Sequence, residues 1–187
     1  MAAPFEQLAT NITVGRGLVI HPDDVPASPF DFDLDTRILL GQRLPYPLSH
    51  NNPNAWEHLG GKIEPEPPKA DKTTYDAARR ETDEEGGVPT ERLPAPFVSG
   101  LTLVERPLED RGYGPSRGKY RVDIYPLRAL GYSLTPFPTE HQALGWFPIQ
   151  TAIKELRLSR ETQLSLLQPR LVGFRVVHLA SQHFEAA

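Results

Sequence analysis

The chain has no cysteine among its 187 residues. This absence excludes disulfides, thiolate metal sites and cysteine nucleophiles. The chain also lacks any apolar run close to the roughly 20 residues that a membrane-spanning helix needs, and residues 1–5 do not show the charged and then apolar pattern of a signal peptide. We therefore expect a protein that does not insert into a membrane and is cytoplasmic by default, with a mature secreted form as the alternative.

An excess of basic residues is also absent. The chain carries 20 lysines and arginines against 24 aspartates and glutamates, which gives a net charge of −4. A charge of this sign excludes a general electrostatic attraction to nucleic acid or to an anionic membrane. An anionic substrate must therefore be bound by local basic groups and a metal ion. With 39% hydrophobic and 24% charged residues, the composition is that of an ordinary globular protein, and the length predicts one domain over 1–187.

Proline and glycine are plentiful and divide the chain into short segments. β-Branched and aromatic residues with partial alternation predict strands over 12–20, 37–43, 97–106 and 119–127. Helices are predicted over 73–85, 149–156 and 159–167, and the segment 171–184 suits either a helix or a strand. Strands and helices mixed in this way indicate an α/β fold.

The helix predicted over 73–85 ends in a group of glutamates. Glu81 precedes Glu84 by three residues and Glu85 by four, so the three side chains share one face of the helix. Like charges at these spacings repel one another. A hard divalent cation, Mg²⁺ or Mn²⁺, would compensate this repulsion, and Arg80 could orient one carboxylate without binding the metal. Taken alone, a solvated acidic face is the simpler interpretation.

The surroundings of this helix resemble the Nudix box, G-x5-E-x7-R-E-U-x-E-E-x-G-U, in which U is bulky and apolar. Residues 80–88, RETDEEGGV, match the second half of the motif, with Thr82 in place of the apolar U. Residues 56–64, WEHLGGKIE, resemble the first half, although Leu59 stands where the family often has proline. The chain is therefore identified as a member of the Nudix family.

The spacing within the box departs from the family pattern. The motif places its arginine fourteen positions after its glycine, whereas Arg80 follows Gly61 by nineteen. The five extra residues fall in a proline-rich stretch over 64–72, which cannot be regular helix and is predicted to be a loop. Candidates for the first glutamate of the box are Glu64 and Glu66 and, more weakly, Asp71.

The resemblance implies a Nudix-type α/β/α sandwich with a mixed central sheet, with a family-like core over about 12–167 and a C-terminal extension over 168–187. It also implies Mg²⁺-dependent cleavage of a phosphoanhydride bond, with Mn²⁺ as a substitute. The metal ligands that it implies are Gly61, through its carbonyl, and the carboxylates of Glu81, Glu84, Glu85 and Glu140. One of Glu84, Glu85 and Glu140 would be the general base. Isopentenyl-diphosphate isomerases share the fold but depend on a cysteine, so they do not fit this chain.

Basic residues near these segments are candidates for binding the substrate: Arg43, Lys62, Arg117, Lys119 and Arg121. The segment 37–43 resembles the family strand that ends in a basic residue near the substrate. The glycine-rich stretch 112–118 and the basic residues after it suit bidentate phosphate recognition, although a solvated hairpin of mixed charge is the simpler interpretation there.

Two kinds of function follow from the resemblance. The first is hydrolysis of a nucleoside diphosphate linked to another moiety, or of a related pyrophosphate such as a diphosphoinositol polyphosphate. The alternative is a ligand-binding or regulatory Nudix module without turnover, which the altered first half of the box favours. We expect hydrolysis, because a non-catalytic relative has no reason to keep mutually repelling carboxylates. Since family members are often dimers, a homodimer is a further expectation.

Overall fold

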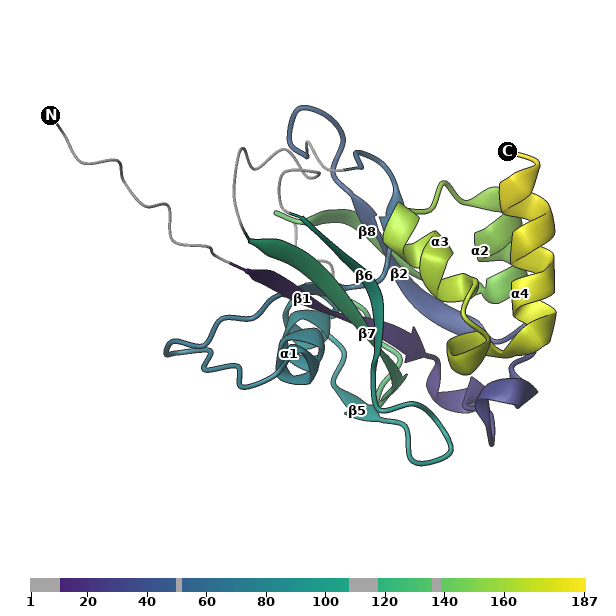
Figure 1. The fold of residues 1–187 in the computed structure, drawn as a ribbon, viewed down its shortest axis with the longest axis horizontal. Coiled ribbons are helices and arrows are strands. Elements are labelled where there is room, and N and C mark those ends of the chain that lie inside the picture. Colours follow the sequence, from purple (N-terminus) through teal and green to yellow (C-terminus); the bar gives the residue numbers. More distant parts are fainter. Residues whose placement is uncertain (1–10, 50–51, 108–117, 136–138) are drawn as a thin grey trace, which may run out of the picture.

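A mixed sheet forms the centre of the computed structural model, which describes residues 11–49, 52–107, 118–135 and 139–187 (Figure 1). Its eight strands are β1 (Ile12–Ile20), β2 (Arg37–Arg43), β3 (Trp56–Glu57), β4 (Gly60–Lys62), β5 (Thr90–Arg92), β6 (Leu101–Pro107), β7 (Lys119–Ala129) and β8 (His141–Pro148). The path through the sheet is β3-β2-β1-β7-β5, while β4 pairs with β1, β6 with β7 and β8 with β2. β1 and β7 are parallel, and the other pairs are antiparallel.

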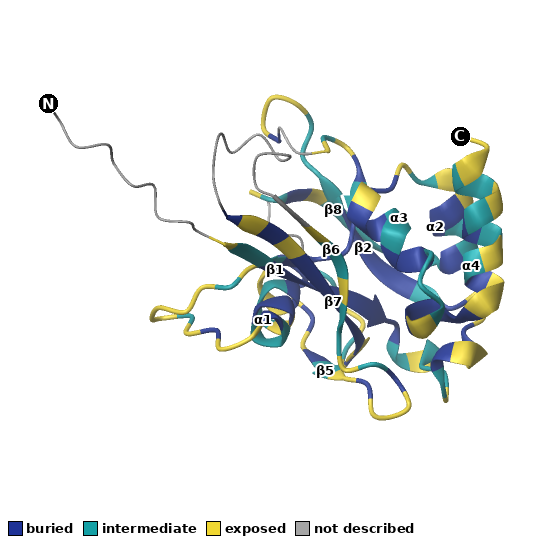
Figure 2. Ribbon diagram, viewed as in Figure 1, coloured by how far each residue is buried: buried dark blue, intermediate teal, exposed yellow. Residues whose placement is uncertain are grey.

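Alternation along the central strands directs apolar side chains to both faces of the sheet. Leu18 and Ile20 of β1 pack into one core with residues of α2 (Ile149–Glu155), α3 (Arg160–Leu166) and α4 (Pro169–Glu185). Val19 packs into a second core with Ala78 of α1 (Thr74–Gly86). Figure 2 shows the buried residues on the central strands and on the helix sides that face them. The arrangement confirms the predicted α/β/α sandwich with a mixed sheet.

Most of the predicted elements are confirmed, and the segment that suited either helix or strand is helix α4. Its Leu171 and Val176 are buried in the same core as α2 and α3, so α4 packs against these helices and shares their core with the sheet. The strand predicted over 97–106 begins only at Leu101, because Phe97 closes a turn onto Pro94 and Gly100 has a φ of 158°. Two short 3₁₀ helices, η1 (Pro22–Asp24) and η2 (Pro29–Asp31), and the short strands β3, β4 and β5 were not predicted. Within the described residues, no helix is long and apolar enough to cross a membrane.

Local signals set the limits of α1, the helix that carries the glutamates. The Thr73 side chain accepts a hydrogen bond from the Asp76 amide, and the Asp76 carboxylate accepts one from the Thr73 amide, so a capping box begins the helix. Gly87 ends it in the left-handed conformation at φ 66° and donates to the Asp83 carbonyl. Thr82 replaces an apolar residue of the box and is fully buried. Its hydroxyl donates a hydrogen bond to the Ala78 carbonyl, so the buried polar group has a partner.

Candidate active site

A cleft of about 280 Å³ brings together most of the residues that the sequence motifs single out. Its lining contains Gly61, Glu81, Glu85, Glu140, Arg43 and Lys62, as well as Val14, Arg16, Asn52, Glu57, Gly60, Glu64, Tyr120 and Glu161. A larger cavity of about 460 Å³ is lined by Arg80 and by residues such as Lys72, Arg79 and Asp83. The smaller cleft is the candidate site because it alone of the two contains Gly61, Glu81 and Glu85.

Gly61 and Glu81 approach each other closely in this cleft. A Cβ on residue 61 would lie 2.4 Å from Glu81 Oε1. Any residue other than glycine at this position would therefore force the Glu81 side chain to shift. Burial raises the pKa of Glu81, and the bond from Arg80 opposes this effect only in part. This wall of the cleft therefore exposes the main chain of Gly61, which has no side chain, beside the Glu81 carboxylate, whose negative charge is poorly solvated.

Glu85 is the more deeply buried of the two cleft carboxylates on α1. It accepts a hydrogen bond from the Gly60 amide at 3.0 Å. Burial raises its pKa to about 8; the Gly60 amide lowers the pKa, and the nearby charge of Glu81 raises it further. A cation in the cleft would relieve the cost of ionising both glutamates. The donors here are all oxygens, which fits a hard divalent cation.

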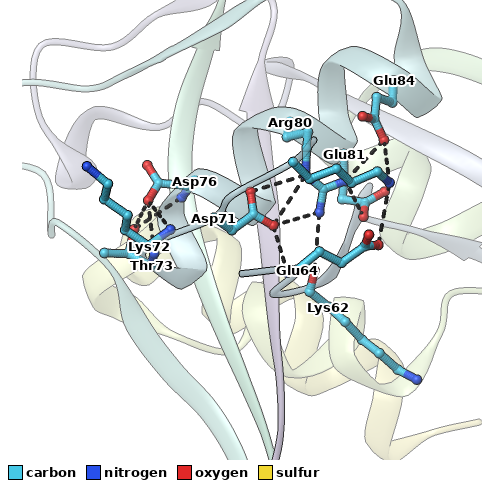
Figure 3. Close-up of polar contacts among 10 residues, drawn as sticks. Lys62, Glu64, Asp71, Lys72, Thr73, Asp76, Arg80, Glu81 and Glu84 are labelled. Carbon is cyan, nitrogen blue, oxygen red and sulfur yellow. Dashed lines mark hydrogen bonds and ion pairs between the residues drawn. The ribbon is translucent and has the colours of Figure 1, made fainter. Parts of the chain in front are cut away.

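Arg80 joins three acidic side chains at the edge of this site (Figure 3). Its Nη1 lies 2.7 Å from Glu81 Oε1 and 3.0 Å from Glu84 Oε2. Its Nη2 lies 2.8 Å from Asp71 Oδ2 and also donates to the Lys62 carbonyl at 3.2 Å. Arg80 therefore connects the loop before α1 to two carboxylates of the helix.

Glu84 does not face the cleft with Glu81 and Glu85. Its exposed carboxylate pairs with Arg80 and with Lys69 Nζ at 3.2 Å. In the part of the chain that the structure describes, no group of three acidic or histidine side chains is already arranged to hold a metal ion. A shared metal site would therefore require Glu84 to turn away from Lys69.

Three acids are candidates for the first glutamate of the box, and of these Asp71 is the one that contacts Arg80. It is buried, and it also accepts a hydrogen bond from the Glu64 amide at 2.9 Å. Glu64 instead pairs with Lys69 at 3.4 Å, and Glu66 is exposed. The candidate that sequence position ranks weakest is thus the one in contact with the arginine of the box.

The opposite wall of the cleft contains a charge network that the sequence reasoning missed. Arg43 lies between Glu57, whose Oε1 is 2.5 Å from its Nε, and Glu140, whose Oε2 is 3.0 Å from its Nη1. Arg16 Nη2 lies 3.4 Å from Glu57 Oε2, and its Nη1 donates to the His58 carbonyl at 2.5 Å. Burial alone would raise the pKa of Glu57, but Arg16, His141 and Arg43 lower it to about 2.

A signal for this network was present in the sequence. Arg16 is the one charged residue in the otherwise apolar or uncharged segment 12–20. A buried arginine needs a buried anion, and the anion is Glu57, which follows directly after Trp56 in the first half of the box.

The structure does not bring Lys119 and Arg121 into the cleft. Side chains alternate along β7, and Tyr120 between them lines the cleft, so its two neighbours face the other side of the strand. Lys119 pairs with Glu105 at 2.7 Å, and Arg121 pairs with Asp123 at 2.8 Å beside a separate small cavity. Arg117 lies outside the described residues.

Comparison with known proteins agrees with this fold. The family model of the NUDIX domain matches residues 25–167. The MutT NUDIX hydrolase from Burkholderia pseudomallei is 21% identical, over 83% of this chain and 95% of that chain, with a TM-score of 0.53. The NUDIX domain of Shewanella oneidensis NrtR, solved in complex with ADP ribose, is 13% identical, over 98% and 94%, with a TM-score of 0.54.

The MutT protein from Methanosarcina mazei Go1 is 14% identical, over 97% of this chain and 98% of that chain, with a TM-score of 0.53. At these identities, the likeness concerns the fold alone. No curated protein matches the chain in sequence. The family match spans most of the chain, includes the box and its glutamates, and agrees with the fold, so the chain belongs to the NUDIX domain family.

Proposed function

We propose that the chain is a Mg²⁺-dependent hydrolase that cleaves a phosphoanhydride bond, with Mn²⁺ as a substitute. The observation that carries the proposal is the cleft itself, in which Glu81 and Glu85 lie beside Gly61 while Arg43 and Lys62 also line the space. Carboxylates that ionise poorly without a cation, together with arginine and lysine in the same small cleft, suit a metal-bound diphosphate. Membership of the NUDIX domain family supports this assignment.

The metal would be held by Glu81, Glu85, the Gly61 carbonyl and a reoriented Glu84. When bound, the cation would neutralise charge on the phosphate oxygens and lower the pKa of a bound water. Arg80 would keep the carboxylate of Glu81 oriented, as it does through its present contact.

Other residues of the cleft would act on the substrate and the attacking water. Arg43 and Lys62 would bind phosphate oxygens. The water oxygen would form a new bond to phosphorus while the anhydride P–O bond breaks, and a carboxylate would accept the proton of the water. Glu140 is our first candidate for this base because it lines the cleft outside the helix cluster, and Glu84 and Glu85 are the alternatives.

For the substrate we propose a nucleoside diphosphate linked to another moiety, or a related pyrophosphate such as a diphosphoinositol polyphosphate. Among the described residues that line the cleft, Tyr120 is the one aromatic side chain. A single ring does not sandwich a base, whereas Arg43 and Lys62 give the cleft two cations besides Arg16, which is buried against Glu57. This composition favours recognition through the diphosphate over recognition through a base.

A ligand-binding module without turnover is the second candidate function. The observation that favours it is the outward position of Glu84, which pairs with Arg80 and Lys69 instead of facing the cleft. The five extra residues of the box fall in the loop over 64–72, which contains Lys69. In this second function, the longer loop would have abolished metal binding while the fold was kept.

Product release with Mg²⁺ and Mn²⁺ separates the two functions. The panel should contain ADP-ribose, NADH, dinucleoside polyphosphates, nucleoside triphosphates, capped RNA and diphosphoinositol polyphosphates. We expect turnover of at least one substrate, and we expect a chelator to abolish it. Glu85→Gln and Glu84→Gln should each lower turnover about a hundredfold or more, because stabilisation of transition-state charge by a metal site is worth several kcal/mol. Glu66→Gln, an exposed loop carboxylate, is the matched control and should keep its activity.

Two outcomes would contradict hydrolysis by this site. Turnover that persists in excess chelator, or in both glutamine variants, would remove the metal from the mechanism. Binding of a panel member by calorimetry, with no product formed from any of them, would establish the binding module instead.

A further inference from the structure

The loop between β4 and α1 is held in a defined shape beside the helix. Its ends are joined by two hydrogen bonds, from the Glu64 amide to Asp71 Oδ2 at 2.9 Å and from the Asp71 amide to the Glu64 carbonyl at 2.9 Å. The Ala70 amide closes a further turn onto the Glu66 carbonyl at 3.1 Å. Lys69 lies within this closed loop, so its position near α1 follows from the backbone and is not that of a free surface lysine.

The positive charge of Lys69 lies beside Glu84, the helix glutamate that faces away from the cleft. Its Nζ lies 3.2 Å from Glu84 Oε2 and 3.4 Å from Glu64 Oε1, and its side chain is 32% exposed. Burial lowers the pKa of Lys69, but the hydrogen bond to Glu84 and the negative charges of Glu84 and Glu81 together raise it overall. The side chain therefore stays charged, and one oxygen of Glu84 accepts from two cations, Lys69 and Arg80.

The two cations differ in how they are held. Arg80 is fixed by the buried Asp71 and also contacts Glu81, so it belongs to the frame of the site. Lys69 pairs with two exposed carboxylates, Glu64 and Glu84, at 3.4 and 3.2 Å. To bind a divalent cation, the Glu84 carboxylate must release the competing ammonium group. Lys69 is the partner that it can release.

We propose that Lys69 is an internal counter-ion that competes with the divalent cation for Glu84 and so weakens metal binding at the cleft. The inference rests on the proposed metal site. With no metal, Lys69 holds Glu84 outward and offsets the repulsion among the helix glutamates. When the metal binds, Glu84 exchanges Lys69 for the metal, while Arg80 keeps its contact with Glu81.

Direct metal binding tests this competition without turnover. We would titrate Mn²⁺ into the wild-type chain, Lys69→Met and Lys72→Met by calorimetry. Lys72 is the matched control because it lies in the same loop, is exposed and carries the same charge. Partly exposed ion pairs are weak, so we expect the Kd for Mn²⁺ to fall about two- to fivefold more in Lys69→Met than in Lys72→Met.

A second background shows whether the effect passes through Glu84. In Glu84→Gln the carboxylate is absent, so adding Lys69→Met should leave the Kd for Mn²⁺ within about 1.5-fold of that of Glu84→Gln alone. Equal Kd values for Lys69→Met and Lys72→Met, weaker binding by Lys69→Met, or an undiminished effect in Glu84→Gln would overturn the inference while leaving the metal site intact. A wild-type chain that binds no Mn²⁺ would overturn the proposed function and this inference together.

Discussion

Asp71 holds Arg80 at two points, with Oδ2 2.8 Å from Nη2 and Oδ1 3.1 Å from Nε. The same guanidinium contacts Glu81 and Glu84 through Nη1. A buried loop carboxylate thus sets the position of an arginine, and the arginine sets the position of two helix glutamates. Asp71 is therefore a positioning residue for the proposed metal site.

Replacing Asp71 with asparagine should weaken both the fold and the site. Arg80 keeps Glu81 and Glu84 as partners, so we expect the free energy of unfolding to fall by about 1–3 kcal/mol, as for loss of a buried bond to a charged group. Urea unfolding measures this change. Glu66→Gln is the control, because its carboxylate is exposed and its replacement should stay within about 0.5 kcal/mol. An Asp71→Asn effect no larger than that of the control would refute the positioning role.

The close contact of Gly61 with Glu81 gives a second prediction. In Gly61→Ala the new Cβ would meet Glu81 Oε1, Cδ and Cγ, all within 3 Å, so the glutamate side chain must move. We expect the Kd for Mn²⁺ to rise about tenfold, which corresponds to about 1.4 kcal/mol. The free energy of unfolding should change little, since a flexible side chain can shift.

Gly131→Ala provides the comparison for this variant, because a Cβ there would meet nothing within 4 Å. Calorimetric titration of both variants decides the question. Unchanged Mn²⁺ affinity in Gly61→Ala would exclude the Gly61–Glu81 wall as part of the metal site.

The fold could be predicted in large part from local signals. The helix predicted over 73–85 begins at a capping threonine and is followed by glycine, and the structure begins and ends α1 within one residue of that prediction. The strands β3, β4 and β5 could not be predicted, because two or three residues carry no periodicity and pair only once the long strands are in place.

The candidate site could be predicted where the box and the segments beside it resemble the family, which also placed Arg43 and Glu140 among the expected residues. Glu81, Glu85 and Gly61 were predicted from the box and share one cleft. Pairing across the sheet is not visible in a sequence, so the contact of Arg16 with Glu57 was missed, although a lone arginine among apolar residues was a signal.

A buried histidine links stability to pH. Burial, with a further effect of Arg16, lowers the pKa of His58 to about 3. Between pH 6.5 and 3 the unfolded chain binds a proton at this residue that the folded chain does not, so its contribution to stability is lost as the pH falls. From 1.36 kcal/mol per pKa unit, the upper limit of this loss is about 5 kcal/mol.

His58→Gln removes this proton linkage and keeps a polar group that can reach Ser165, whose Oγ lies 2.8 Å from His58 Nε2. We expect the difference in unfolding free energy between pH 7 and pH 4 to be smaller in this variant than in the wild-type chain. His178→Gln, at an exposed position, should follow the wild-type curve. Parallel curves for all three proteins would show that His58 does not set the acid sensitivity.

Substrate affinity should depend on Arg43 and not on Lys119. Arg43 lines the cleft and is held between Glu57 and Glu140, whereas Lys119 lies on the far side of β7 and pairs with Glu105. An interaction with phosphate that is equal in the ground and transition states changes KM alone. We therefore expect Arg43→Gln to raise KM for the phosphoanhydride substrate about tenfold or more, from the 1.5–3 kcal/mol of a charge-assisted hydrogen bond.

The matched variant Lys119→Gln removes the same charge and should leave KM within about twofold of the wild-type value. Steady-state kinetics over a range of substrate concentrations separates KM from kcat in both variants. Arg43→Gln also leaves Glu57 with one fewer cation, so urea unfolding must show that the variant is folded at the assay temperature. A rise in KM in Lys119→Gln that equals or exceeds the rise in Arg43→Gln would place the substrate on the outer face of β7 and away from the cleft.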